Sequence, residues 1–164
     1  MIQYYEGDIL ESGADIICHQ VNCKGAFGRG MAGQIKKKFP AVEKTYKMLT
    51  SQWTQKAGGK TSALLGKVSA QPVELDGRWF LIANLYGQDD YGKTGLFTDY
   101  AALETAMKEI RSFVDARQKQ ETVAFPYKMG CGYAGGDWKV VEHMIQEIFG
   151  DYAGEVQIWK LCEE

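Results

Sequence analysis

The chain has 164 residues, a length that suits one globular domain with its own apolar core. Apolar residues make up 45% of the sequence and charged residues 24%, which excludes a disordered or collagen-like chain. The formal charge of -2 gives no whole-molecule field that attracts a polyanion, so we expect no nonspecific binding to nucleic acid.

The sequence contains no recognisable export signal or membrane span. Its first residues lack a basic segment followed by an apolar run, and no stretch has the roughly 18 apolar residues needed to cross a bilayer. We therefore expect a cytoplasmic monomer without membrane contact. The cysteines lack the C-x-x-C spacing of a zinc site, so we expect free thiols and neither a metal nor a cofactor.

The first part of the chain is predicted to contain two strands followed by two helices. Apolar runs over residues 2–5 and 16–21 predict two strands, and the second leads through the segment CKGAFGRGMAG into a helix from about Met31. Pro40 permits a new helix, which should end before Gly58. The buried stripe of this helix consists of Val42, Tyr46 and Leu49.

A hairpin follows, because the dipeptide Asp76-Gly77 tolerates positive φ and separates two strand-like runs, residues 65–75 and 78–86. The second run, WFLIANLY, is almost continuously apolar, as in a strand covered on both faces. Thr98 or Asp99 then caps a long helix. The residues of that helix expected on its buried face are Tyr100, Leu103, Met107, Ile110 and Val114.

The last third contains a strand at residues 122–125, a second glycine-rich run, GCGYAGG, a helix and a final strand at residues 155–161. The helix begins after Asp137 and turns four residues inward: Trp138, Val141, Ile145 and Phe149. The order of elements predicts a mixed α/β fold with three layers, α/β/α.

Two glycine-rich loops carry the functional signal. Residues 28–33 and 130–135 both fit G-x-G-x-x-G, and each lies between a predicted strand and a predicted helix. Glycine lets the backbone approach a ligand, and the first turn of a helix presents free N–H groups to an anion. Two such loops suit a diphosphate, although both can also be simple tight turns.

Other enzyme classes fit the sequence poorly. A nicotinamide-binding Rossmann unit requires a second strand ending in an acid about twenty residues after the glycine turn, where this chain has a helix and a polar loop. A phosphate-binding Walker loop ending at Gly59-Lys60-Thr61 would need glycine at Thr54. With only two histidines, His19 and His143, no Ser-His-Asp or H-E-x-x-H arrangement can be assembled.

The ordered motifs resemble the macrodomain family over nearly the whole chain. They are Gly7-Asp8-Ile9, Val21-Asn22-Cys23, the segment GAFGRGMA at residues 25–32 and Gly130-Cys131-Gly132. The resemblance is closest to the branch with terminal ADP-ribose protein glycohydrolase, DNA ADP-ribosyl glycohydrolases and ADP-ribose 1''-phosphate phosphatases. It implies a mixed sheet of about six strands between helices, with ADP-ribose across the carboxyl ends of the central strands.

The same resemblance implies the ligand contacts. Asp8 would accept a hydrogen bond from the adenine amino group, the N–H of Ile9 would meet a ring nitrogen, and Asn22 would hold the distal ribose hydroxyls. Phe97 would stack on the ligand, although an aromatic residue before a helix is often part of the core. The first loop would wrap the distal ribose and a phosphate through Gly28, Arg29, Gly30, Met31 and Ala32. The second would close over the diphosphate through Gly130, Cys131, Gly132, Tyr133, Ala134 and Gly135.

The resemblance leaves the chemistry open. Gln88 stands where glycohydrolases of this branch have a catalytic lysine, which argues against a lysine nucleophile. Asp137 matches an acidic position that would activate water, but it also suits the N-cap of the following helix. His19 resembles a histidine of the phosphatase-like members, where imidazole would move a proton, although a lone strand histidine is often structural.

We therefore expect an ADP-ribose-binding hydrolase that removes ADP-ribose from a modified protein or nucleic acid, with Asp137 activating water and without a metal. One alternative is an ADP-ribose 1''-phosphate phosphatase that uses His19. The other is a binding module that recognises ADP-ribose without turnover.

Overall fold

The computed structural model describes residues 1–162, which form six strands, four α-helices and two short 3-10 helices. The strands are β1 (Ile2–Glu6), β2 (Ile16–Asn22), β3 (Val68–Leu75), β4 (Arg78–Gln88), β5 (Val123–Pro126) and β6 (Val156–Lys160). The α-helices are α1 (Gly30–Lys38), α2 (Pro40–Lys56), α3 (Tyr100–Arg117) and α4 (Trp138–Phe149). The 3-10 helices are η1 (Ile9–Glu11) and η2 (Thr61–Leu64).

The strands make one mixed sheet in the order β1-β6-β5-β2-β4-β3. All neighbouring strands are parallel except β3, which pairs antiparallel with β4 through the predicted hairpin. The turn of that hairpin places Asp76 and Gly77 at φ 53° and 80°, the positive values that make Asp-Gly a favourable pair. Parallel strands end at the same edge of the sheet, so β2, β4 and β5 deliver the loops that follow them to one place.

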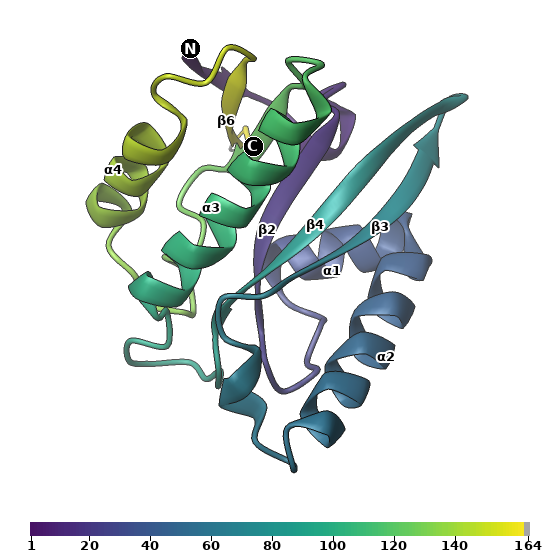
Figure 1. Cartoon of the computed structure of the whole chain (residues 1–164), viewed down its shortest axis with the longest axis vertical. Helices are drawn as coiled ribbons and strands as arrows, with labels where there is room; N and C mark the ends of the chain where they lie inside the picture. The colour runs from purple at the N-terminus through teal and green to yellow at the C-terminus, as the bar shows by residue number, and fades with distance from the viewer. Residues whose placement is uncertain (163–164) are drawn as a thin grey trace.

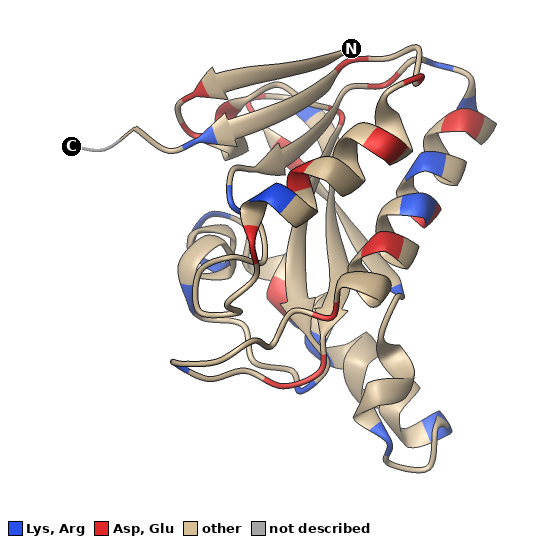
Figure 2. Cartoon of the chain, turned by 90° about the vertical axis from the view of Figure 1, so that its left-hand side faces the viewer, with Lys and Arg blue, Asp and Glu red and all other residues tan. Residues whose placement is uncertain are grey.

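Helices cover both faces of the sheet (Figure 1). The α3–α4 layer lies on one side, and Figure 2 views the molecule from there. The α1–α2 layer lies on the other side, and each layer has its own core against the shared strands. Alternation along β2 explains this arrangement, because Ile16 and Cys18 join one core whereas Ile17 and Val21 join the other. The predicted three-layer α/β fold is confirmed.

The helix caps follow the sequence signals. The side chain of Asp99, rather than that of Thr98, accepts a hydrogen bond from the N–H of Ala102 at 3.0 Å and begins α3. Asp137 does the same for α4 by accepting from the N–H of Lys139 at 2.9 Å. Both helices turn their predicted apolar stripes to the sheet, with Leu103 fully buried in α3.

Within residues 1–162, no helix combines the length and the apolar character that a membrane span requires. The same part of the chain contains no cluster of three or more His, Cys, Asp or Glu side chains arranged to hold a metal ion. The four cysteines are free thiols: Cys18, Cys23, Cys131 and Cys162.

Candidate functional site

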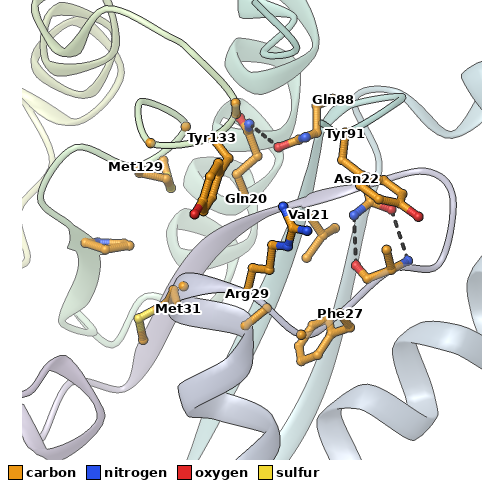
Figure 3. Close-up of a pocket in the computed structure, with 18 of the residues that line it drawn as sticks. Gln20, Val21, Asn22, Phe27, Arg29, Met31, Gln88, Tyr91, Met129 and Tyr133 are labelled. Atoms are coloured by element: carbon orange, nitrogen blue, oxygen red, sulfur yellow. Dashed lines mark hydrogen bonds between the residues drawn. The ribbon is translucent and has the colours of Figure 1, made fainter. Parts of the chain in front are cut away.

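A cavity of about 830 Å³ opens at the carboxyl edge of the sheet, where β2, β4 and β5 end (Figure 3). Such edges are the usual ligand sites of open α/β sheets. Both glycine-rich loops line this cavity. The lining from β2 and the first loop includes Gln20, Val21, Asn22, Ala26, Phe27, Gly28, Arg29, Gly30, Met31 and Ala32. The lining that follows β4 and β5 includes Gln88, Tyr91, Gly92, Pro126, Tyr127, Lys128, Met129, Gly130, Gly132, Tyr133 and Ala134.

The first loop is shaped by Asn22 at the end of β2. Its Oδ1 accepts hydrogen bonds from the N–H groups of Lys24 at 2.9 Å and Ala26 at 3.2 Å, and its Nδ2 donates to the carbonyl of Ala26 at 2.8 Å. The hydroxyl of Tyr46 also donates to Oδ1, at 3.0 Å. Asn22 therefore fixes the turn (Figure 3), and its contact with the distal ribose stays a prediction.

Unpaired backbone donors begin where this loop enters α1. Arg29 occupies the N-cap position but makes no side-chain capping bond. In the part of the chain that the structure describes, the N–H groups of Gly30, Met31 and Ala32 have no backbone or side-chain acceptor outside the helix. All three residues line the cavity, so the first loop presents a set of donors suited to an anion.

The second loop presents a similar set. The N–H groups of Gly132, Tyr133 and Ala134 have no acceptor among residues 1–162, whereas that of Gly135 donates to the carbonyl of Gly132 at 3.0 Å. All three residues line the cavity, as does Gly130 of the same loop. Residues of both loops whose N–H groups have no acceptor among residues 1–162 therefore line one cavity, and their binding of a diphosphate stays a prediction.

Buried polar side chains hold the second loop in place. The hydroxyl of Thr98 donates to the carbonyl of Gly130 at 2.7 Å and accepts from Nε2 of Gln20 at 2.9 Å. The same Nε2 donates to Oε1 of Gln88 at 2.9 Å (Figure 3). The carbonyl of Ala134 accepts from the N–H groups of Phe97 at 2.7 Å and Thr98 at 3.1 Å. These bonds tie the loop to β2, β4 and the segment before α3.

Side chains from the two loops meet across the cavity. The Arg29 guanidinium lies over the Tyr133 ring, 5.2 Å from its centroid, and Figure 3 shows the two reaching toward each other. Within residues 1–162, Arg29 forms no ion pair. Lys128 also lines the cavity and lies over the Tyr127 ring, with Nζ 5.6 Å from the centroid. Among residues 1–162, these two cations of the lining contact aromatic rings and form no ion pair.

A third part of the lining comes from α1 and α2. Lys36, Glu43 and Lys47 all contribute to it. The Glu43 carboxylate lies 3.2 Å from Nζ of Lys36 and 3.5 Å from Nζ of Lys47. Glu43 is the one carboxylate among the residues that line the cavity, and both ammonium groups compensate its charge.

Several residues implied by the resemblance lie outside the lining. Asp8 caps η1, where its carboxylate accepts from the N–H of Leu10 at 2.9 Å, and Ile9 is buried in the core of the α1–α2 layer. The half-buried ring of Phe97 packs beside Gly92, which itself lines the cavity. Cys131 and Gly135 belong to the second loop but do not line the cavity. Their predicted contacts with a ligand remain predictions.

Asp137 also lies beside the cavity rather than in its lining. Its carboxylate caps α4, and its backbone N–H donates to the Tyr100 hydroxyl at 2.9 Å. Burial is the main cause that raises the pKa of the Cys131 thiol to about 11, and the Asp137 carboxylate raises it further. The charge of Asp137 therefore acts on the second loop. Cys131 is thus a neutral thiol at pH 7, and the catalytic role of Asp137 remains a prediction.

His19 is buried in the middle of β2 and does not line the cavity. Burial lowers the pKa of its imidazole to about 4, although the bond to Asn84 acts in the opposite direction. Nε2 lies 2.5 Å from Oδ1 of Asn84, and the ring packs edge-on against Phe27 with the centroids 5.5 Å apart. The imidazole is therefore neutral and supports a residue of the cavity wall from behind. Its proton-transfer role stays a prediction.

Gln88 lies in the cavity lining, at the end of β4, where the resemblance would place a lysine. Its side chain is hydrogen-bonded to neighbouring residues, and its Nε2 donates to the carbonyl of Asp90 at 2.9 Å. Sequence reasoning did not single out residues 126–129, which lie at the end of β5 and directly after it and line the cavity. The rule that ligands lie beyond the carboxyl ends of parallel strands would have found them.

The chain is similar to known proteins along most of its length. The chain is 30% identical over 157 residues to the ADP-ribose 1''-phosphate phosphatase of Candida albicans, covering 90% of this chain and 93% of that protein. It is 28% identical to the DNA ADP-ribosyl glycohydrolase of Mycobacterium tuberculosis, covering 91% of this chain but 39% of that protein. No family model matches the chain.

Solved structures also match the chain over most of its length. The macrodomain of Mycobacterium tuberculosis DarG superposes with a TM-score of 0.74 at 25% identity, covering 97% of both chains. The chain belongs to the macrodomain family. Thermosipho africanus DarTG in complex with ADP-ribose shares the fold with a TM-score of 0.79 at 18% identity, and the match covers 97% of this macrodomain and 41% of that chain.

Proposed function

We propose that this macrodomain binds ADP-ribose in the cavity and hydrolyses a bond at the distal ribose, releasing ADP-ribose from a modified protein or nucleic acid. The observation that carries the proposal is the pair of backbone cradles, Gly30 to Ala32 and Gly132 to Ala134, which line one cavity and whose N–H groups have no acceptor among residues 1–162. Amide donors converging from two loops suit the two phosphates of a diphosphate. The volume of about 830 Å³ lies in the range of small-molecule sites.

The relatives favour this ligand over other diphosphates. The Candida albicans protein is named as a phosphatase of ADP-ribose 1''-phosphate, the Mycobacterium tuberculosis protein as a DNA ADP-ribosyl glycohydrolase, and the Thermosipho africanus structure contains ADP-ribose. These substrates share the ADP-ribose moiety and differ in the group attached to its distal ribose. That shared moiety is what we assign to the cavity.

Asp137 is our candidate for activating water. One of its carboxylate oxygens caps α4, while Oδ2 makes no recorded hydrogen bond within residues 1–162. The residue directly follows the second loop, so a ligand held by that loop would lie close to it. Gln88 cannot act as a nucleophile, so the proposed reaction relies on an activated water, with the loop amides stabilising developing negative charge.

Two alternatives have specific support. Phosphate removal from ADP-ribose 1''-phosphate is supported by the name of the Candida albicans relative. Recognition without turnover is supported by the absence of a lysine at Gln88 and by the cap role of Asp137. Both alternatives keep ADP-ribose in the cavity and differ only in what happens at its distal ribose.

Calorimetry with free ADP-ribose tests the shared part of the proposal, with ADP and NAD as comparison ligands. We expect ADP-ribose to bind more tightly than either, and absence of measurable binding would contradict all three functions. Turnover assays with an ADP-ribosylated peptide, an ADP-ribosylated oligonucleotide and ADP-ribose 1''-phosphate then separate them. Release of ADP-ribose from either polymer supports hydrolysis, release of phosphate supports the phosphatase, and binding without turnover supports recognition alone.

A further inference from the structure

Charge is distributed unevenly along this chain. Ten of its 19 Lys and Arg residues lie between positions 22 and 67, together with a single acid, Glu43, so this segment has a formal charge of +9. The rest of the chain carries nine basic and 20 acidic residues, a formal charge of -11. The overall value of -2 is therefore the sum of two large opposite charges and describes neither part of the chain.

The basic segment forms one layer of the fold. Residues 22–67 comprise the first glycine-rich loop, α1, α2 and η2, which lie on one side of the sheet (Figure 1). Nine of the ten basic side chains are exposed, and Lys38 is half-buried. We call this surface the α1–α2 basic face. Its members are Lys24, Arg29, Lys36, Lys37, Lys38, Lys44, Lys47, Lys56, Lys60 and Lys67.

Few of these charges are compensated. Lys36 and Lys47 share Glu43, Lys24 lies 3.6 Å from Asp89, and Lys38 lies 3.5 Å from Glu11. The other six form no ion pair within residues 1–162. The opposite layer differs, because basic and acidic residues are mixed along α3, and α4 carries one lysine and two glutamates (Figure 2). Three ion pairs join residues four apart in α3 and just beyond it.

The α1–α2 basic face is continuous with the mouth of the cavity. Arg29, Lys36 and Lys47 belong both to the face and to the lining. At the same edge of the sheet, Nζ of Lys24 donates to the hydroxyl of Thr61 at 2.7 Å, which places Lys60 close to the start of the first loop. A linear polyanion on this face would therefore reach the cavity.

We propose that the α1–α2 basic face binds the phosphodiester backbone of a nucleic acid, independently of base sequence. The exposed residues between the lysines of α2 include the hydroxyl and amide side chains of Ser51, Gln52 and Gln55, which are common hydrogen-bond donors to phosphate, together with Met48. An anionic membrane is the poorer fit, because α2 directs Val42 and Tyr46 into the core and Met48 is its one exposed large apolar side chain, which is little for insertion. Seven of the ten members of the face lie outside the cavity lining, so the proposal does not depend on the proposed function.

Fluorescence anisotropy with labelled oligonucleotides of about 20 nucleotides, single-stranded and duplex, tests the proposal at several salt concentrations. We expect binding whose logarithm falls linearly with the logarithm of salt concentration. The test variant is Lys37→Gln, Lys44→Gln and Lys56→Gln combined, three exposed lysines that do not line the cavity. It should weaken binding about ten-fold or more near 50 mM salt and reduce the salt slope by about 2 to 3.

The matched control combines Lys108→Gln, Lys119→Gln and Lys139→Gln, which removes the same charge from exposed positions outside the basic segment. We expect this control to bind oligonucleotides nearly as the original protein does. Equal losses in both triple variants, or no binding at low salt, would overturn the proposal. So would tighter binding to phosphatidylserine vesicles than to oligonucleotides. Calorimetry with ADP-ribose should be unchanged in both variants, which separates failure of this proposal from failure of the proposed function.

Discussion

At the scale of single residues, the buried imidazole of His19 links the core to the pH dependence of stability. Nε2 contacts Oδ1 of Asn84, while Nδ1 is buried without a partner among residues 1–162. Burial lowers the pKa from 6.5 to about 4, so the folded state holds the ring neutral at pH values where the unfolded chain takes up a proton. The stabilisation is therefore fully present above pH 6.5 and is lost as the pH falls toward 4.

His19→Gln tests this linkage, because glutamine retains an N–H donor for Asn84 but does not titrate. Between pH 7 and pH 4.5, the free energy of unfolding should fall more steeply in the original protein than in the variant. The difference should approach about 3 kcal/mol at its maximum. Urea unfolding at a series of pH values measures it. Parallel pH profiles for the two proteins would show that His19 does not contribute.

Asp137 can act as a helix cap, as a base, or as both, and two substitutions separate these roles. Asparagine is as good an N-cap as aspartate, so Asp137→Asn should leave stability unchanged, whereas Asp137→Ala should lose about 0.5–2 kcal/mol. If the carboxylate activates water, both variants should lose about 100-fold or more in turnover with ADP-ribose binding retained. Wild-type turnover by Asp137→Asn would leave only the cap role.

At the scale of elements, the second glycine-rich loop depends on two glycines for different reasons. Gly135 has φ +74°, and a Cβ there would overlap the carbonyl oxygen of Gly95. Gly132 has no heavy atom within 4 Å of a Cβ position, and its N–H belongs to the cradle. One glycine is therefore required by the conformation of the loop, and the other borders the space reserved for a ligand.

Gly135→Ala should lower the free energy of unfolding by about 1–3 kcal/mol, because alanine is strained at that φ and meets backbone atoms. The matched variant Gly132→Ala should change stability by less than about 0.5 kcal/mol but weaken ADP-ribose binding, since its methyl group adds bulk beside the cradle. Thermal unfolding and calorimetry provide the two measurements. Equal destabilisation by both substitutions would contradict this division of roles.

Most elements were predictable from the sequence because their signals are local. The Asp76-Gly77 turn, the Asp99 cap and the stripe around Leu103 each depend on residues close together in the chain. The site was predictable only in part. The cradles were found because glycine spacing is local, whereas the burial of His19 and the position of Asp137 outside the lining depend on packing between distant segments.

At the scale of the whole molecule, charge separates the α1–α2 layer from the rest of the protein, whereas packing against shared strands connects the two helix layers. The basic residues gather in the α1–α2 layer, which opposes the acidic excess of the remainder. The apolar cores are separate too, one on each face of the sheet, but β2 and β4 contribute to both. Because the same strands pack against both layers, neither layer can lose its core without exposing strands that the other needs. We therefore expect the two layers to unfold together.

A core substitution on one face tests this cooperativity. Leu103 is fully buried in the α3–α4 core, so Leu103→Ala should lower the free energy of unfolding by about 2–5 kcal/mol. Trp53 lies in α2, on the opposite layer, and a variant that retains it as the sole tryptophan reports on that layer by fluorescence. If the layers unfold together, fluorescence and far-UV circular dichroism should give coincident urea transitions with and without Leu103→Ala. An α1–α2 layer that stays folded after the circular dichroism signal begins to fall would instead indicate two independently unfolding units.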